Sequence, residues 1–202
     1  MIPLLLLLLS TPASAAPAPA AAAYGIVVDN SAGFRSSLDG AISAGRALVG
    51  ASGPEDRAFV IRFVGGDNFE LSQDFTSSRA DLADALDNMY AEAGKPALLD
   101  AAALAAEHLG SPESLKKAPA TKRALVLLAS GDDRGSFVTA EKLIERLLAT
   151  KTRVFAIGWP SDPKERKLLE RLALETGGRA YFPASAEEAQ KAAVDIVAAI
   201  KR

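Results

Sequence analysis

"RALVLLASGDD", residues 123–133, contains an apolar run in the middle of this 202-residue chain. The run 124–129 is nearly continuous, which is typical of a central strand covered on both faces. "YGIVVD" at residues 24–29 and "TRVFAIGW" at residues 152–159 have the same character. Such buried strands occur where helices pack on both faces of a mostly parallel sheet, so these runs predict an α/β protein.

The segments between these runs have helical apolar spacing, as Leu38, Ile42, Leu48 and Val49 illustrate. We predict helices over residues 36–49, 76–89, 97–110, 138–150, 162–178 and 185–200, and further strands over 57–64, 68–75 and 179–184. Because the third strand follows a very short turn, it should be antiparallel and at an edge. The expected fold is a three-layer, doubly wound, mostly parallel six-stranded sheet with helices on both faces and a polar loop over 111–122.

The N-terminus has the pattern of a signal peptide. An apolar run over residues 2–10 precedes small residues at Ala13 and Ala15, an A-x-A cleavage pattern, and is too short to span a bilayer comfortably. No Lys or Arg precedes the run, so a misassigned start or a buried apolar segment is the alternative. We expect a signal peptide over 1–15, a Pro/Ala linker over 16–23 and one domain over 24–202. The domain would then be exported to the periplasm or outside the cell, with no membrane span.

Composition excludes several classes of function. The chain has no cysteine and a single histidine, His108, so disulfides, thiolate sites, histidine triads and multi-histidine zinc sites are excluded. We expect His108 to be a satisfied residue near a helix end and not a ligand. The net charge is −2 with both signs interspersed, which argues against a nucleic-acid partner.

Topology alone predicts where a ligand would bind. In open parallel sheets the site lies beyond the carboxyl ends of the strands, at the point where the strand order reverses. Residues 29–33, 94–97 and 130–135 can meet there. The paired acids of "GDDRG" in the last loop could act as a general acid/base dyad, but such a run is more often a solvated loop.

These loops and the order of the elements resemble the von Willebrand factor A domain over residues 24–200. "KRALVLLASGDDRGS", "GKPALLDAAALAAEHL" and "LLERLALETGGRAYFPASAEE" are similar to a bacterial group of such domains found largely in acidobacteria. The resemblance implies a protein-binding fold. It also implies a metal-ion-dependent adhesion site, in which Asp-x-Ser-x-Ser, a Thr and an Asp hold Mg²⁺ and a partner's carboxylate completes the shell.

The metal-site pattern is only partly present in this chain. Asp29 and Ser31 match the first acid and the first hydroxyl. Gly33 stands at the second Ser, Pro96 at the Thr and Ser130 at the loop Asp. Because Mg²⁺ requires about six oxygen ligands in near-octahedral geometry, these losses predict a degenerate site.

The residues that remain could hold an ion only weakly, and we expect no cofactor beyond weak Mg²⁺ or Ca²⁺. The ligands would be Asp29, Ser31, Ser130 and Asp132. We favour a structural role for Asp29 and Ser31 over ion binding, in which they accept backbone N–H groups of the nearby loop or helix.

The predicted function is that of an exported protein-binding domain, acting in adhesion or as a scaffold without a metal. Its partner is an unidentified protein, and the predicted binding surface contains Asn30, Gly33, Pro96, Asp133 and Trp159. Trp159 could equally be an ordinary packed tryptophan. Two alternatives are a metal-dependent module with a rearranged Mg²⁺ or Ca²⁺ site and a hydrolase on a doubly wound sheet. Against the hydrolase, the sequence lacks a nucleophile elbow, a P-loop and a dinucleotide fingerprint.

Overall fold

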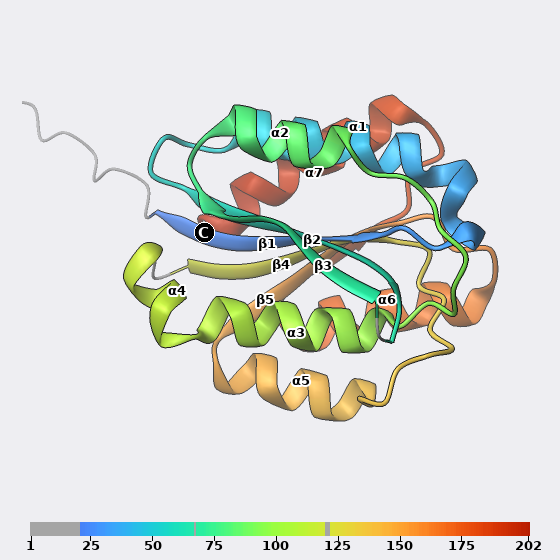
Figure 1. The fold of residues 1–202 in the computed structure, drawn as a ribbon. Coiled ribbons are helices and arrows are strands. Elements are labelled where there is room, and N and C mark those ends of the chain that lie inside the picture. Colours follow the sequence, from blue (N-terminus) through green and yellow to red (C-terminus); the bar gives the residue numbers. More distant parts are fainter. Residues whose placement is uncertain (1–20, 67, 120–121) are drawn as a thin grey trace, which may run out of the picture.

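A six-stranded sheet forms the middle layer of the structure, a computed structural model that describes residues 21–66, 68–119 and 122–202 (Figure 1). The strands are β1 Ala22–Asp29, β2 Arg57–Gly65, β3 Asn68–Thr76, β4 Lys122–Ala129, β5 Thr152–Gly158 and β6 Arg179–Tyr181. Their order is β3-β2-β1-β4-β5-β6. Among the strands that the structure describes, only β3 is antiparallel to its neighbour, and it lies at an edge. The predicted fold class is therefore confirmed.

Helices cover both faces of the sheet. They are α1 Arg35–Ala51, preceded by the 3-10 turn η1 Ala32–Phe34, then α2 Arg79–Asp87, α3 Leu98–Gly110, α4 Pro112–Lys117, α5 Ala140–Ala149, α6 Pro163–Glu175 and α7 Ala186–Ile200. Figure 1 shows α1, α2 and α7 on one face and α3, α5 and α6 on the other. Two apolar cores, one on each face, hold the three layers together.

The two central strands explain the continuous apolar runs. Successive side chains of a strand point to opposite faces. Val126 and Leu128 of β4 lie in the core beneath α1 and α7, and Leu125 and Leu127 lie in the core beneath α3 and α5. Since helices cover both faces of the sheet, this part of the strand has no solvent-facing position for a polar residue.

The segment predicted as a polar loop over 111–122 contains the short helix α4, so that prediction was wrong. Ser111 caps this helix by accepting the N–H of Ser114, and Pro112 occupies its first turn. Proline at the start of a helix after a serine cap is a recognised start signal, which the polar composition of the segment obscured.

The N-terminal predictions lie mostly outside the described residues, including the signal peptide over 1–15. Strand β1 begins at Ala22, two residues before the predicted strand and within the predicted linker. Among the residues that the structure describes, no helix combines the length and the apolar character needed to cross a bilayer.

Candidate functional site

The three predicted loops meet at the carboxyl end of the sheet. Ser130, after β4, donates its hydroxyl to Oδ2 of Asp29 at the end of β1, with 3.1 Å between the oxygens. The N–H groups of Arg134 and Gly135 donate to the carbonyl of Pro96 at 2.9 and 2.8 Å. The loop over 130–135 thus joins the other two loops at the place that topology predicts.

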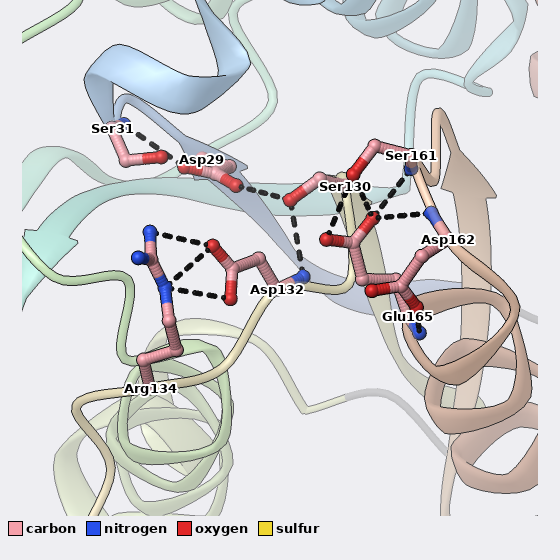
Figure 2. Close-up of polar contacts among 8 residues, drawn as sticks. All are labelled: Asp29, Ser31, Ser130, Asp132, Arg134, Ser161, Asp162 and Glu165. Carbon is pink, nitrogen blue, oxygen red and sulfur yellow. Dashed lines mark hydrogen bonds and ion pairs between the residues drawn. The ribbon is translucent and has the colours of Figure 1, made fainter.

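Asp29 is fully buried and uses both carboxyl oxygens inside the protein (Figure 2). Its Oδ1 accepts the N–H of Ser31 at 2.9 Å, and its Oδ2 accepts the Ser130 hydroxyl. That hydroxyl oxygen accepts the N–H of Asp132 at 3.1 Å. Burial raises the pKa of Asp29, while the hydrogen bonds from Ser31 and Ser130 oppose this rise. Asp29 therefore fixes the shape of the loop after β1 and of the loop after β4.

The side chains around Asp29 do not fit the oxygen shell that Mg²⁺ requires. Gly33 and Pro96 offer no side-chain oxygen, and Asp132 points its carboxylate at Arg134, whose Nε lies 3.0 and 2.9 Å from the two oxygens. The Ser31 hydroxyl is buried without a hydrogen-bond partner. Within the described residues, no group of three or more His, Cys, Asp and Glu side chains is arranged to hold a metal.

The residues predicted for the partner-binding surface are not equally accessible. Asn30 and Pro96 are buried, Gly33 is exposed, and Asp133 and Trp159 are half-buried. Asn30 links chain segments, since its N–H donates to the Phe63 carbonyl and its amide nitrogen to the Tyr90 carbonyl. Of the five, only Gly33, Asp133 and Trp159 reach the surface.

Asp133 points away from Asp29 and toward the start of α3. Its Oδ1 accepts the Ser136 hydroxyl at 2.6 Å and, at 3.4 Å, the N–H of Leu99. Burial raises the pKa of Asp133, and these hydrogen bonds oppose the rise. The two acids of "GDDRG" are thus held by different partners, which does not favour a shared acid/base role.

A hollow of about 560 Å³ opens beside Asp29, at the ends of β1, β4, β5 and β6. Serine hydroxyls and three aromatic side chains line it, and its charged residues are Asp132, Glu165 and Arg166. The Trp159 ring packs edge-on against Phe34, with 5.8 Å between the ring centroids. Sequence reasoning predicted Ser31, Ser130, Asp132 and Trp159 but not the contribution of α6.

The contribution of α6 comes from its capping box. Asp162 accepts the N–H groups of Lys164 and Glu165, and the Glu165 carboxylate accepts the N–H groups of Ser161 and Asp162 in return. This exchange holds Glu165 at the wall of the hollow. The signal "SDPKE" is visible in the sequence as a helix start, but only the fold brings it beside Asp29.

A second hollow, of about 510 Å³, lies at the same end of the sheet beside Phe137. The Phe137 side chain is 90% exposed, although the Asp100 carboxylate accepts the N–H groups of Phe137 and Val138 at 2.8–3.1 Å. Gly65, Gly66, Gly94 and Gly135 form part of the wall. Sequence reasoning missed Phe137 because nothing local marks an aromatic residue as exposed.

His108 lies at the other end of α3, away from these hollows. Its Nε2 is 3.0 Å from Oδ1 of Asp74, and its ring stacks on Phe75. The expectation of a satisfied helix-end histidine is confirmed.

Comparisons with known proteins agree with this architecture. The von Willebrand factor type A domain family matches residues 25–195. No curated protein matches the chain significantly in sequence. An aerotolerance-related membrane protein of Bacteroides fragilis, carrying multiple mutations to serines, is similar at a TM-score of 0.71 and 18% identity, over 88% of this chain and 99% of that chain.

Two further solved structures are similar. BatB of Bacteroides thetaiotaomicron has a TM-score of 0.71 and 15% identity over 89% of this chain and 98% of its own. Proximal thread matrix protein 1 of the mussel byssus has a TM-score of 0.69 and 18% identity over 90% of this chain and 46% of its own. At these identities the likeness shows the fold.

Proposed function

Since the chain belongs to the von Willebrand factor type A family, whose domains generally mediate protein–protein interactions and are not enzymes, we propose that it is an adhesion or scaffold module that binds a protein partner. The observation that carries the proposal is Phe137. A phenyl group that is 90% exposed while its backbone is held by Asp100 is a preorganised contact point. Burying such a side chain in an interface gains about 1.5–3 kcal/mol, and little conformational entropy is lost.

Capture of a partner tests this function. The immobilised chain should retain a defined protein from the periplasm or the medium, and Phe137→Ala should abolish the retention. Leu174→Ala is the matched control, because Leu174 is 78% exposed but lies near the end of α6, away from the loops. Equal loss in both variants, or no loss in either, would reject the loop end as the binding surface.

The proposal includes metal independence. It is supported by the three replaced ligand positions and by the ion pair of Asp132 with Arg134, which engages the carboxylate of Asp132. Calorimetric titration with Mg²⁺, Ca²⁺ and Mn²⁺ should give no micromolar binding. Micromolar binding that Asp29→Ala removes would instead favour the metal-dependent alternative with a rearranged site.

A gain-of-function variant also tests metal independence, by restoring the missing ligand side chains. Gly33→Ser, Pro96→Thr and Ser130→Asp together should restore a set of oxygen ligands and make thermal stability rise with added Mg²⁺. The single variant Gly33→Ser is the control and should show no such rise. If the triple variant also shows none, these loops do not correspond to the metal-site loops of the family.

The proposal also includes export and the absence of enzymatic activity. Export is supported by the signal pattern of residues 1–15 and would be checked by fractionation and by N-terminal sequencing, with Ala16 expected as the first mature residue. The hydrolase alternative lacks support because the single histidine lies away from the hollows. Turnover of generic phosphate or ester substrates, lost in Asp29→Ala, would revive it.

A further inference from the structure

We propose that the hollow beside Asp29 binds a basic side chain of the partner, either a lysine ammonium or an arginine guanidinium. The inference rests on the proposed function and names what the partner presents at this site. A metal-loaded adhesion site would take a partner's carboxylate, so the expected charge of the contacting group is reversed in this chain.

The first support is the acidic character of the hollow. Asp132 and Glu165 line it, and Asp29, which does not itself line it, is hydrogen-bonded to Ser31 and Ser130 of its wall (Figure 2). None of the ion pairs among the described residues includes Asp29 or Glu165. Their carboxyl groups accept only backbone N–H groups and serine hydroxyls, so neither acid has a cationic partner among the described residues.

The two arginine side chains near the hollow do not neutralise its acidic residues. Arg166 lines the wall, but its Nε lies 3.0 Å from Oε1 of Glu170 and its guanidinium lies 3.9 Å from the centroid of the Phe182 ring. Its charge is therefore directed along α6 and not at Asp29. Arg134 pairs with Asp132 from outside the hollow, with a side chain that is 64% exposed. An acidic partner group would thus meet like charge, and a basic group would meet opposite charge.

The second, independent support is the hydroxyl of Ser31. This residue is only 1% exposed, it lines the hollow, and its Oγ has no hydrogen-bond partner within the described part of the chain. A buried hydroxyl without a partner is costly, and a ligand that donates an N–H to its oxygen would remove this cost. Lysine and arginine carry only donors, which suits the Asp132 and Glu165 carboxylates and the serine hydroxyl oxygens that line the site.

The third support is aromatic. Trp159 and Phe182 both line the hollow, and a cation over an aromatic face is attracted by the ring quadrupole, most strongly for tryptophan. Arg166 already uses the Phe182 ring in this way. An incoming basic side chain could therefore place its charged end near the acids and its methylene groups against the Trp159 ring.

Trp159 is the only tryptophan in the sequence, so its indole N–H gives a single reporter signal in NMR spectra. We would titrate the chain with N-acetyl-lysine amide and N-acetyl-arginine amide, and use N-acetyl-norleucine amide and N-acetyl-glutamate amide as controls. The basic probes should shift the indole signal saturably and less strongly at high salt, and the controls should leave it unchanged. A shift with the glutamate probe alone, or with all four probes, would overturn the proposal.

A pair of variants on α6 locates the effect. Glu165→Gln keeps an acceptor for the capping box but removes the negative charge. It should lower the binding affinity for the basic probes by roughly fivefold. Glu175→Gln is the matched control, because Glu175 lies on the same helix outside the hollow and pairs with Arg171. Equal binding in the two variants contradicts the proposal, and thermal melting confirms that each is folded.

The two sets of experiments distinguish failure of this inference from failure of the proposed function. If a protein partner is captured in a Phe137-dependent manner while the basic probes fail to bind, the inference about charge fails and the protein-binding function stands. If the probes bind but no partner is captured, the protein-binding function fails.

Discussion

Gly131 turns the loop after β4 toward the candidate site. Its φ is +93°, and a Cβ at this position would lie 2.5 Å from the Glu165 carbonyl oxygen. Both features disfavour any residue with a side chain, because the left-handed region is strained for such residues and the contact is with backbone. We expect Gly131→Ala to lower the free energy of unfolding by about 1–3 kcal/mol, measured by chemical denaturation.

Gly33 provides the matched control for Gly131. It lies at the same end of the sheet, but a Cβ there would meet nothing within 4 Å. Gly33→Ala should change the free energy of unfolding by less than about 0.5 kcal/mol. A comparable loss of stability in both variants would show that the strain at Gly131 is not the cause.

Individual site residues were predictable from the sequence to different degrees. Asp29 and Ser130 were found because the first ends a buried strand and the second directly follows one, and parallel strands place their ends at one edge. The burial of Asn30 was not predictable, since it depends on the neighbouring Phe63 and Tyr90 carbonyls. The exposure of Phe137 depends on a clamp from a residue 37 positions away, for which the sequence contains no local signal.

Among the elements, α3 and the loop before α5 are joined by the Asp100 clamp. The Asp100 carboxylate accepts the N–H groups of Phe137 and Val138, and the Asp100 N–H donates to the Ser136 hydroxyl. We expect Asp100→Ala to free the first two amides, so that their hydrogen exchange becomes roughly tenfold faster. NMR exchange measurements check this.

The control for the clamp is Glu107→Ala, on the same helix. Glu107 pairs with Arg146 at an exposed site, so this variant should leave exchange at Phe137 and Val138 unchanged. If Asp100→Ala also leaves exchange unchanged, the loop is held by other contacts. Partner capture would then be expected to survive the substitution.

Strand β3 and helix α4 are joined by the ion pair of Asp74 with Lys117. The hydrogen bond from Lys117 is the main cause that lowers the pKa of Asp74, while burial acts in the opposite direction. A carboxylate with a lowered pKa stabilises the fold above its unfolded-state pKa, and this stabilisation is lost as the pH falls through the folded-state pKa. Lys117→Met should therefore raise the pKa of Asp74 and move the acid loss of stability to higher pH.

NMR titration of the Asp74 carboxyl and denaturation at several acidic pH values would measure this effect. Lys116→Met removes a neighbouring exposed charge that forms no hydrogen bond or ion pair with Asp74 in the described part of the chain, so it should leave the Asp74 pKa nearly unchanged. Equal pKa changes in the two variants would indicate a general charge effect and not the ion pair.

The elements themselves followed from the sequence where their patterns are long. The apolar runs of β1, β4 and β5 and the spacing of α5, with Leu143, Ile144 and Leu147 buried, are strong signals over many residues. Helix α4 has six residues and buries only Ser114, so periodicity could not reveal it. Short elements depend on caps and tertiary contacts more than on pattern.

For the molecule as a whole, Asp56 holds the start of β1 and the end of α7 together at one end of the sheet. It is 4% exposed, and its carboxylate accepts the N–H of Ala22 at the start of β1 at 3.0 Å and the N–H of Gly53 at 2.6 Å. The ammonium of Lys201, just after α7, lies 2.7 Å from Oδ2 of Asp56. One side chain therefore connects the first strand, the second strand and the last helix.

Removing Asp56 should destabilise the whole domain and not only one loop. Asp56→Ala leaves a buried N–H group, a half-buried N–H group and a mostly buried ammonium without their acceptor, so we expect a loss of about 3 kcal/mol in the free energy of unfolding. Asp87→Ala breaks an exposed pair with Arg46 and should cost less than about 1 kcal/mol. Chemical denaturation followed by both Trp159 fluorescence and far-ultraviolet circular dichroism would measure both changes. Because Trp159 lies at the opposite end of the sheet from Ala22, coincident curves in Asp56→Ala would show that the two ends unfold together, whereas separated curves would show that the end at Ala22 opens independently.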